Sequence, residues 1–282
     1  MDLFPGCGNP PELGNGIVLL PHHLLVKDYI EAMYNSLAKQ DWKHLVIVSP
    51  DHFGYGATSI STPDEREHGF TVHRDYAAEY FPDATVEGFR VQTATSEAEI
   101  LAFVEQLQTI ETAHVPDSTL FIFSIDFSHY LPGGIAHVHD LYSMDVLRAR
   151  VIDDARKLEV DSPVAAEILL RFLVAKNAVL TNMMNTNPSY DIGVDTFENT
   201  THVFACSRSL ASLGLNEAHT RDLTVDMFFA HPRDWYLGRT AEDRYLYGTD
   251  STTFDQDGAT DRAVITNRRE GTTTEFTFDY FE

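Results

Sequence analysis

Three apolar segments of this 282-residue chain are each followed, two to four residues later, by a histidine. They are Ile17–Leu20 before His22, Leu45–Val48 before His52, and Phe121–Ile125 before His129. A single histidine beyond a buried strand is usually structural, but three at neighbouring strand ends would converge in space. Imidazoles held by rigid strands suit a first-row metal ion, so the spacing predicts a metal site.

A two-histidine site needs a carboxylate to complete it, and it then leaves positions open for substrate or dioxygen. Asp126 directly follows the third apolar segment, and Glu159 and Asp161 shortly precede a helix that should start at Pro163. Any of the three carboxylates could ligate. Asp161 also has a structural explanation, because an acidic side chain at a helix start complements the helix dipole.

A second cluster of reactive side chains lies between the predicted strands. It contains Glu67 and His68, with His73 five residues further along the chain. These residue types could take part in acid–base chemistry or metal binding. The alternative interpretation is a solvated, charged loop that runs into a helix.

The elements that must position these residues follow from hydropathy. Unbroken apolar runs indicate strands buried on both faces, and segments of helical periodicity alternate with them. The predicted helices are Leu24–Lys39, Ser96–Glu111 opened by a capping box, Ala136–Lys157 as one helix or two, and Ser162–Lys176; His202–Cys206 closes the pattern as a strand. The pattern predicts an α/β fold with a largely parallel central sheet covered by helices on both faces.

The chain divides into three predicted parts. Residues 1–16 are rich in glycine and proline and predict an irregular arm, and residues 17–210 carry the α/β pattern. Residues 211–282 form a C-terminal extension, expected to pack on the main domain. Within it, Ala263–Asn267 and Thr273–Phe278 flank an Arg-Arg-Glu-Gly turn and predict a β-hairpin.

Composition excludes several classes of partner. The net charge of −23 opposes binding to nucleic acid or to anionic lipid. No apolar run approaches the roughly 18 residues of a membrane span. Cys7 and Cys206 are too few for a disulfide framework or a cysteine-type zinc site. The glycine- and proline-rich start lacks a signal peptide's apolar region, so a cytoplasmic location is expected.

Four of these motifs, taken in order, resemble the Memo family, called AmmeMemoRadiSam system protein B in bacteria. They are Pro21-His22, Ser49-Pro50-Asp51-His52, Glu67-His68 with His73, and Ser124-Ile125-Asp126-Phe127-Ser128-His129. The resemblance covers roughly residues 15–210 and implies a fold similar to class III extradiol ring-cleaving dioxygenases, which hold Fe(II) with two histidines and a glutamate. It implies that His22 and His52 ligate the metal and that His68, His73, Asp126 and His129 line the second sphere or the substrate pocket.

The chain departs from the family at the third ligand. Many members have a cysteine there, in a Cys-Gly segment before a helix that begins near proline. Counting back from Pro163 puts Glu159 at the cysteine position, and a one-turn adjustment would let Asp161 serve instead. We expect Glu159, because its longer side chain reaches further and a helix start mildly disfavours a nearby cation.

Three functions are compatible with this sequence. The first is a Memo-like metal-binding protein acting as a non-haem Fe(II) dioxygenase on an unidentified small molecule, with His129 as general acid or base oriented by Asp126. The second is a hydrolase that uses zinc to activate water. The third, implied by the family's association with a radical S-adenosylmethionine protein, is a non-enzymatic accessory role in binding a metal or a partner.

Overall fold

The computed structural model describes Phe4, Cys7, residues 16–115, 117–131, 133–191 and 199–214, and the strands 246–247, 260–267 and 272–279. The chain separates into two compact units, Met1–Thr220 and Arg221–Glu282. The predicted irregular arm, residues 1–16, lies outside the described residues except for Phe4, Cys7 and Gly16. No helix among the described residues is long and apolar enough to cross a membrane.

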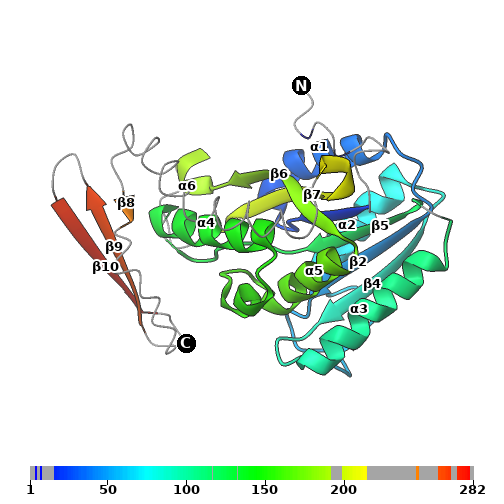
Figure 1. Ribbon diagram of the computed structural model, residues 1–282, viewed down its shortest axis with the longest axis horizontal. Coiled ribbons are helices and arrows are strands. Elements are labelled where there is room, and N and C mark those ends of the chain that lie inside the picture. The colour runs from blue at the N-terminus through cyan, green and yellow to red at the C-terminus, as the bar shows by residue number, and fades with distance from the viewer. Residues whose placement is uncertain are drawn as a thin grey trace. The chain divides into compact units, whose positions relative to one another are not determined.

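The first unit is built on a seven-stranded sheet with the strand order β3-β4-β2-β5-β1-β7-β6 (Figure 1). The strands are β1 Ile17–Leu20, β2 His44–Pro50, β3 Ile60–Ser61, β4 Thr85–Val91, β5 Thr119–Ser124, β6 Ala178–Thr186 and β7 His202–Ser209. The four central strands β4, β2, β5 and β1 are parallel, whereas β3, β7 and β6 pair antiparallel at the two edges. The predicted α/β fold with a largely parallel sheet is confirmed.

Helices cover both faces of this sheet (Figure 1). They are α1 Lys27–Leu37, α2 His68–Tyr80, α3 Glu97–Thr112, α4 Gly133–Ala149, α5 Pro163–Ala175 and α6 Pro188–Asp191, with short 3-10 helices at Leu24–Val26, Ile152–Lys157 and Ala211–Leu213. One apolar core lies under α3, α4 and α5, and the other lies under α1 and α2. The segment predicted as one helix or two is α4 followed by a 3-10 helix, and Arg150 separates them at φ 55°.

The apolar runs are unbroken because the central strands contribute alternate side chains to both cores. Ile17 and Leu19 enter the core under α3–α5, while Val18 and Leu20 enter the core under α1 and α2. The same alternation holds along β2 and β5. A strand buried on both faces has no solvent side on which polar residues would be favoured.

The starts of α3 and α5 match their sequence signals, whereas the helices predicted from Leu24 and Ala136 begin at Lys27 and Gly133. Ser96 and Glu99 form a reciprocal capping box at α3, and the Glu99 carboxylate also accepts a hydrogen bond from the Ser59 hydroxyl. Ser162 caps α5 by accepting the amide hydrogen of Ala165, and Pro163 occupies the first turn. The position of α5 matters for function, because the loop that precedes it carries Asp161.

We expect Ser96→Ala to lower the free energy of unfolding by about 1 kcal/mol, because the α3 amides at this end lose their acceptor. Chemical denaturation of the purified protein measures the change. Thr109→Ala, near the other end of α3, is the matched control and should be neutral or slightly stabilising. Equal stability of Ser96→Ala and the control would show that the cap contributes nothing.

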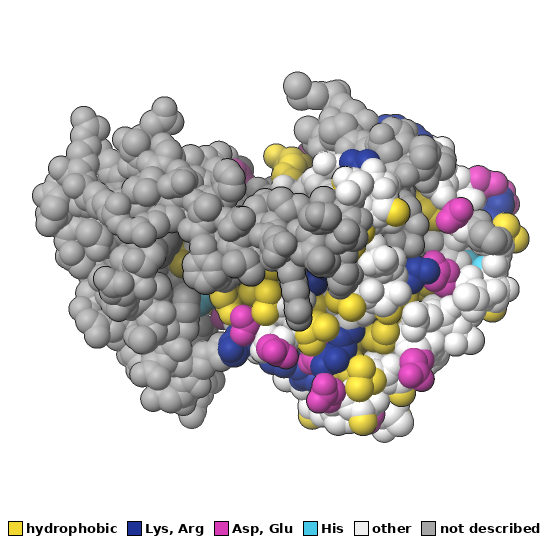
Figure 2. Space-filling view, viewed as in Figure 1, with side chains coloured by type: hydrophobic (Ala, Val, Ile, Leu, Met, Phe, Trp, Pro, Cys, Tyr) yellow, Lys and Arg dark blue, Asp and Glu magenta, His cyan; other side chains and the backbone are white. Residues whose placement is uncertain are grey.

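Basic side chains on the α3 and α5 surface are paired with acidic ones. Arg171 lies 2.7 Å from Glu97 and Lys176 lies 2.5 Å from Glu111. Figure 2 shows dark-blue and magenta side chains close together on the described part of this face. With 20 basic and 43 acidic residues in the chain, such pairing still leaves a strongly negative molecule.

A disulfide joins Cys7 to Cys206 of β7 across 199 residues. It fixes the start of the chain over the core of α1 and α2, where Phe4 is buried against Phe204 with ring centroids 5.4 Å apart. The sequence does not predict this bond, because two cysteines do not make a framework and their proximity depends on the tertiary fold.

The second unit contains a three-stranded antiparallel sheet of order β10-β9-β8. Its strands are β8 Leu246–Tyr247, β9 Thr260–Asn267 and β10 Thr272–Asp279. The pairing of β9 with β10 agrees with the hairpin predicted for this region, although both strands are longer than predicted.

Candidate metal centre

The loops after β1, β2 and β5 meet at one end of the sheet. These three strands are parallel neighbours, so His22, His52 and Asp126 follow them at the same edge. The rings of His22 and His52 lie 5.0 Å apart between centroids. Among the described residues, two groups could hold a metal ion, His22–His52–His68 and His22–Asp126–Asp161.

Asp161 is the carboxylate that lies between the two predicted histidine ligands. Its Oδ2 is 3.2 Å from His22 Nε2 and 3.6 Å from His52 Nε2. Its backbone amide donates to the Asp126 carbonyl, which fixes the loop before α5 against the loop after β5. Although the side chain is only 7 % exposed, neither carboxylate oxygen has a hydrogen-bond donor. Burial raises the pKa of Asp161 to about 7.

The hydrogen bonds of His22 determine which ring nitrogen carries its proton. The Ser124 hydroxyl donates to the Gly69 carbonyl, so it must accept from His22 Nδ1, 2.9 Å away. Burial holds the pKa of His22 well below its usual value, which leaves the imidazole neutral. The Nε2 lone pair therefore faces two carboxylates, at 3.2 Å from Asp161 and 3.3 Å from Asp126.

Two carboxylates beside this lone pair are unfavourable unless a proton or a metal ion lies among them. A neutral imidazole presents only an acceptor at Nε2, and each carboxylate oxygen is also an acceptor. Ligands at about 2.0–2.2 Å from one ion lie roughly 3 Å from one another, close to the separations seen here. Both groups of possible ligands contain His22, and Asp161 lies beside the Nε2 atoms of His22 and His52, so these three residues are candidates to hold one metal ion.

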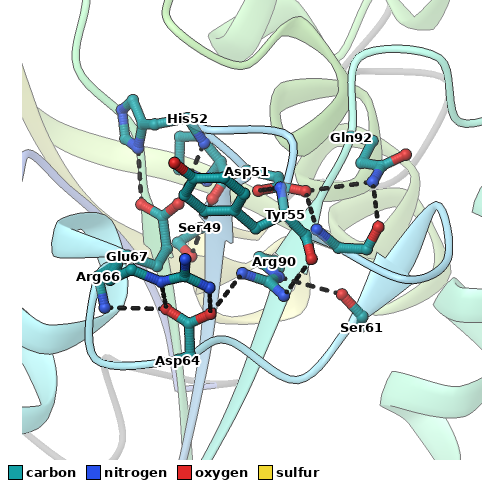
Figure 3. Close-up of polar contacts among 12 residues, drawn as sticks. Ser49, Asp51, His52, Tyr55, Ser61, Asp64, Arg66, Glu67, Arg90 and Gln92 are labelled. Atoms are coloured by element: carbon teal, nitrogen blue, oxygen red, sulfur yellow. Dashed lines mark hydrogen bonds and ion pairs between the residues drawn. The ribbon is translucent and has the colours of Figure 1, made fainter.

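Glu67 orients the second histidine (Figure 3). Its carboxylate accepts from His52 Nδ1 at 2.6 Å and from the His52 amide at 3.0 Å, and the side chain is fully buried. The same carboxylate accepts from Gly69 at the start of α2, so it also caps that helix. Burial lowers the pKa of His52, but Asp161 and Glu67 outweigh it and raise the pKa to about 10. A positive charge is therefore favoured at this position.

We expect Glu67→Gln to weaken metal binding about 10–100-fold, because a carboxylate behind a histidine ligand fixes its tautomer and increases its basicity. Isothermal titration of Fe(II) or Zn(II) into metal-free protein measures the effect. Glu65→Gln, an exposed change two residues away, is the matched control. Equal affinities of the two variants would mean that Glu67 only caps α2.

The other predicted site residues take up different positions. His68 stacks on His52 with ring centroids 4.1 Å apart, at the open side of the cluster. His129 is partly buried beyond β5, and burial lowers its pKa. His73 is fully buried on α2, where its Nδ1 lies 3.1 Å from the Tyr34 hydroxyl. It belongs to neither group of possible ligands, which favours a packing role.

Glu159, the expected third ligand, also lies outside both groups of possible ligands. The backbone turns just after it, where the Val160 amide donates to the Leu158 carbonyl. The next residue, Asp161, is then held against Asp126 and directed at the histidines. The geometry thus favours the alternative carboxylate over the one preferred from the sequence.

Asp126 lies beside His22 and belongs to one of the two groups of possible ligands. Its Oδ1 accepts from the His22 amide at 3.0 Å, and its Oδ2 lies beside His22 Nε2. The carboxylate therefore orients His22 and the loop after β1. Its influence on His129 is electrostatic, where it partly offsets the lowering of the pKa by burial.

A histidine pair beside the centre was missed in the sequence. His23 Nδ1 lies 3.2 Å from His202 Nε2, and His202 Nδ1 lies 3.0 Å from the Thr186 hydroxyl. Burial lowers the pKa of His202 to about 4, so that ring is neutral. Because β7 runs antiparallel to β1, its first residue lies at the carboxyl end of β1. The sequence predicted that a strand begins at His202. Hydropathy did not show that this strand runs antiparallel to β1, which is what brings His202 to the site.

Comparison with known proteins adds no assignment. No protein family matches the chain, and no curated protein is similar enough in sequence to match it.

Proposed function

We propose that the first unit is a Memo-like, metal-dependent protein whose centre is formed by His22, His52 and Asp161. One observation carries the proposal. The neutral His22 imidazole directs its Nε2 lone pair at a buried carboxylate that has no hydrogen-bond donor. A metal ion among these acceptors would satisfy them without a proton on Asp161.

Iron(II) is the proposed ion, and the proposed chemistry resembles that of a dioxygenase. Two imidazoles and one carboxylate form the ligand set typical of non-haem Fe(II) oxygenases, in which the ion supplies open positions for substrate and dioxygen. The chain's part is to hold these ligands rigidly. Ser124 and Glu67 fix the two rings, and the Asp126 carbonyl fixes Asp161.

His129 is the proposed general acid or base. It lies in the same loop as Asp126, and burial keeps its imidazole in the neutral form that accepts a proton. His68 lies on the open side of the centre, where it would contact a bound substrate. The substrate itself is proposed to be an unidentified small molecule.

Metal analysis of protein purified without oxygen tests the proposal, with His52→Ala beside the wild type. We expect about one iron per wild-type chain and little in the variant. Circular dichroism should show that both are folded. Zinc in place of iron would favour a hydrolase, and equal metal content in the two proteins would refute the proposed centre.

A further inference from the structure

Exposed apolar side chains gather next to the histidines of the proposed centre. Among the described residues, large apolar side chains that are exposed and lie within three positions of a site histidine are Leu24, Leu25, Phe53, Tyr55 and Tyr130. Single exposed apolar residues are common on protein surfaces. A group of them in the three loops that surround one site is uncommon and indicates a binding surface.

Phe53 and Tyr55 form the best-defined part of this group. Their rings stack with centroids 5.7 Å apart, and each side chain is about half exposed, at 50 % and 52 %. The Phe53 ring lies 6.2 Å from the His52 ring and 6.1 Å from the His68 ring. We call this stacked pair the aromatic platform. It lies next to the histidines of the proposed centre and is exposed at the surface.

The loop that carries the aromatic platform is held by hydrogen bonds on several sides (Figure 3). Asp51 accepts from the amides of Tyr55 at 3.1 Å and Gly56 at 2.8 Å, and Arg90 donates to the Tyr55 carbonyl at 3.0 Å. A Cβ at Gly56 would come within 2.7 Å of the Asp51 carboxylate, so a side chain there would displace a group that holds the loop.

Charged groups hold the outer side of the same loop. Asp64 pairs with both Arg66 and Arg90, and the Arg66 guanidinium lies 4.0 Å from the centre of the Tyr55 ring. Gly54, between the two aromatic residues, has φ 64°. The rings are thus presented in a preformed position, which lowers the entropy lost when a ligand stacks on them.

We propose that the aromatic platform is the substrate-docking wall of the centre and selects a molecule that has a planar ring and no negative charge. This inference rests on the proposed function in one respect: the metal centre would bind the polar end of the substrate. The stacking of the substrate's ring on the platform needs no metal. The strongly acidic chain and the buried Asp126 and Asp161 disfavour an anionic ligand. A protein partner would require about 20–30 residues on each side, far more than this group supplies.

The test uses two uncharged probes, benzyl alcohol and cyclohexylmethanol, which differ in the planarity of their rings. Saturation-transfer NMR measures their binding to metal-free protein. We expect wild-type protein to bind benzyl alcohol more tightly than cyclohexylmethanol, and Phe53→Ala to bind benzyl alcohol about 3–10-fold more weakly. Phe53→Tyr should retain binding. Leu101→Ala, which removes an exposed apolar side chain on α3, is the matched control and should bind as wild type.

The outcomes separate this inference from the metal centre. Binding that is preserved in His22→Ala and lost in Phe53→Ala supports the platform even if no metal is found. Equal binding of both alcohols, no binding of either, or equal losses in Phe53→Ala and Leu101→Ala would overturn it. Self-association that Phe53→Ala abolishes, without any effect on benzyl alcohol, would make the platform an interface between copies and also overturn it.

Discussion

Replacing Asp161 by asparagine will weaken metal binding by more than about 100-fold, whereas replacing Glu159 by glutamine will leave it unchanged. The difference follows from position, because Asp161 lies 3.2 Å and 3.6 Å from the two histidine nitrogens and Glu159 is outside the group. Loss of a direct ligand should exceed the 10–100-fold typical of residues that support ligands. Titration of Fe(II) into the metal-free proteins, without oxygen, measures both affinities.

Stability provides the internal control for this pair. The Asp161 carboxylate is buried and accepts no hydrogen bond, so the asparagine removes a costly charge without breaking a bond. Metal-free Asp161→Asn should therefore melt at or above the temperature of metal-free wild type. If Glu159→Gln lost the metal and Asp161→Asn retained it, Glu159 would be the third ligand, as expected from the sequence.

Removing the disulfide will lower the free energy of unfolding by about 2–5 kcal/mol. The bond closes a loop of 199 residues, and long loops lose the most conformational entropy when they are cross-linked in the unfolded chain. Denaturation of Cys7→Ser/Cys206→Ser beside oxidised wild type measures the effect. Adding a reductant to unfolded wild type should reproduce the loss on refolding.

A count of free thiols tests whether the bond exists. Both cysteines are fully buried, so native wild type should react with no thiol reagent and should release two thiols only after unfolding and reduction. Two thiols after unfolding without reductant would contradict the bond. The disulfide also weighs against the expected cytoplasmic location, because such bonds are rare in the reducing cytosol.

The strands that carry the centre were predictable because burial on both faces leaves a plain signal. The strands β1, β2 and β5 are unbroken apolar runs, and the rule that parallel strands end at one edge brought His22 and His52 together. The strand β4 was missed because its first half is partly exposed and carries Glu87. The strand β6 was missed because polar residues and an irregularity between Thr181 and Met184 interrupt its pattern.

The choice between Glu159 and Asp161 as the proposed third ligand depends on one turn of the backbone. Counting from Pro163 assumes a fixed path between Glu159 and the helix, but a hydrogen bond from Val160 to Leu158 reverses the chain there. The amide of Asp161 then binds the Asp126 carbonyl, a contact across 35 positions of the sequence. Hydropathy and residue spacing indicate burial and periodicity. They cannot predict a hydrogen bond between two loops that are distant in the sequence.

The position of a bound metal is the sharpest test of the proposed centre. Crystals of the protein loaded anaerobically with Fe(II) should be measured on both sides of the iron absorption edge. We expect one anomalous peak per chain, about 2 Å from His22 Nε2, His52 Nε2 and an Asp161 oxygen. A fully occupied iron held by other residues, or an ordered Asp161 that meets a hydrogen-bond donor and no metal, would refute the proposed centre.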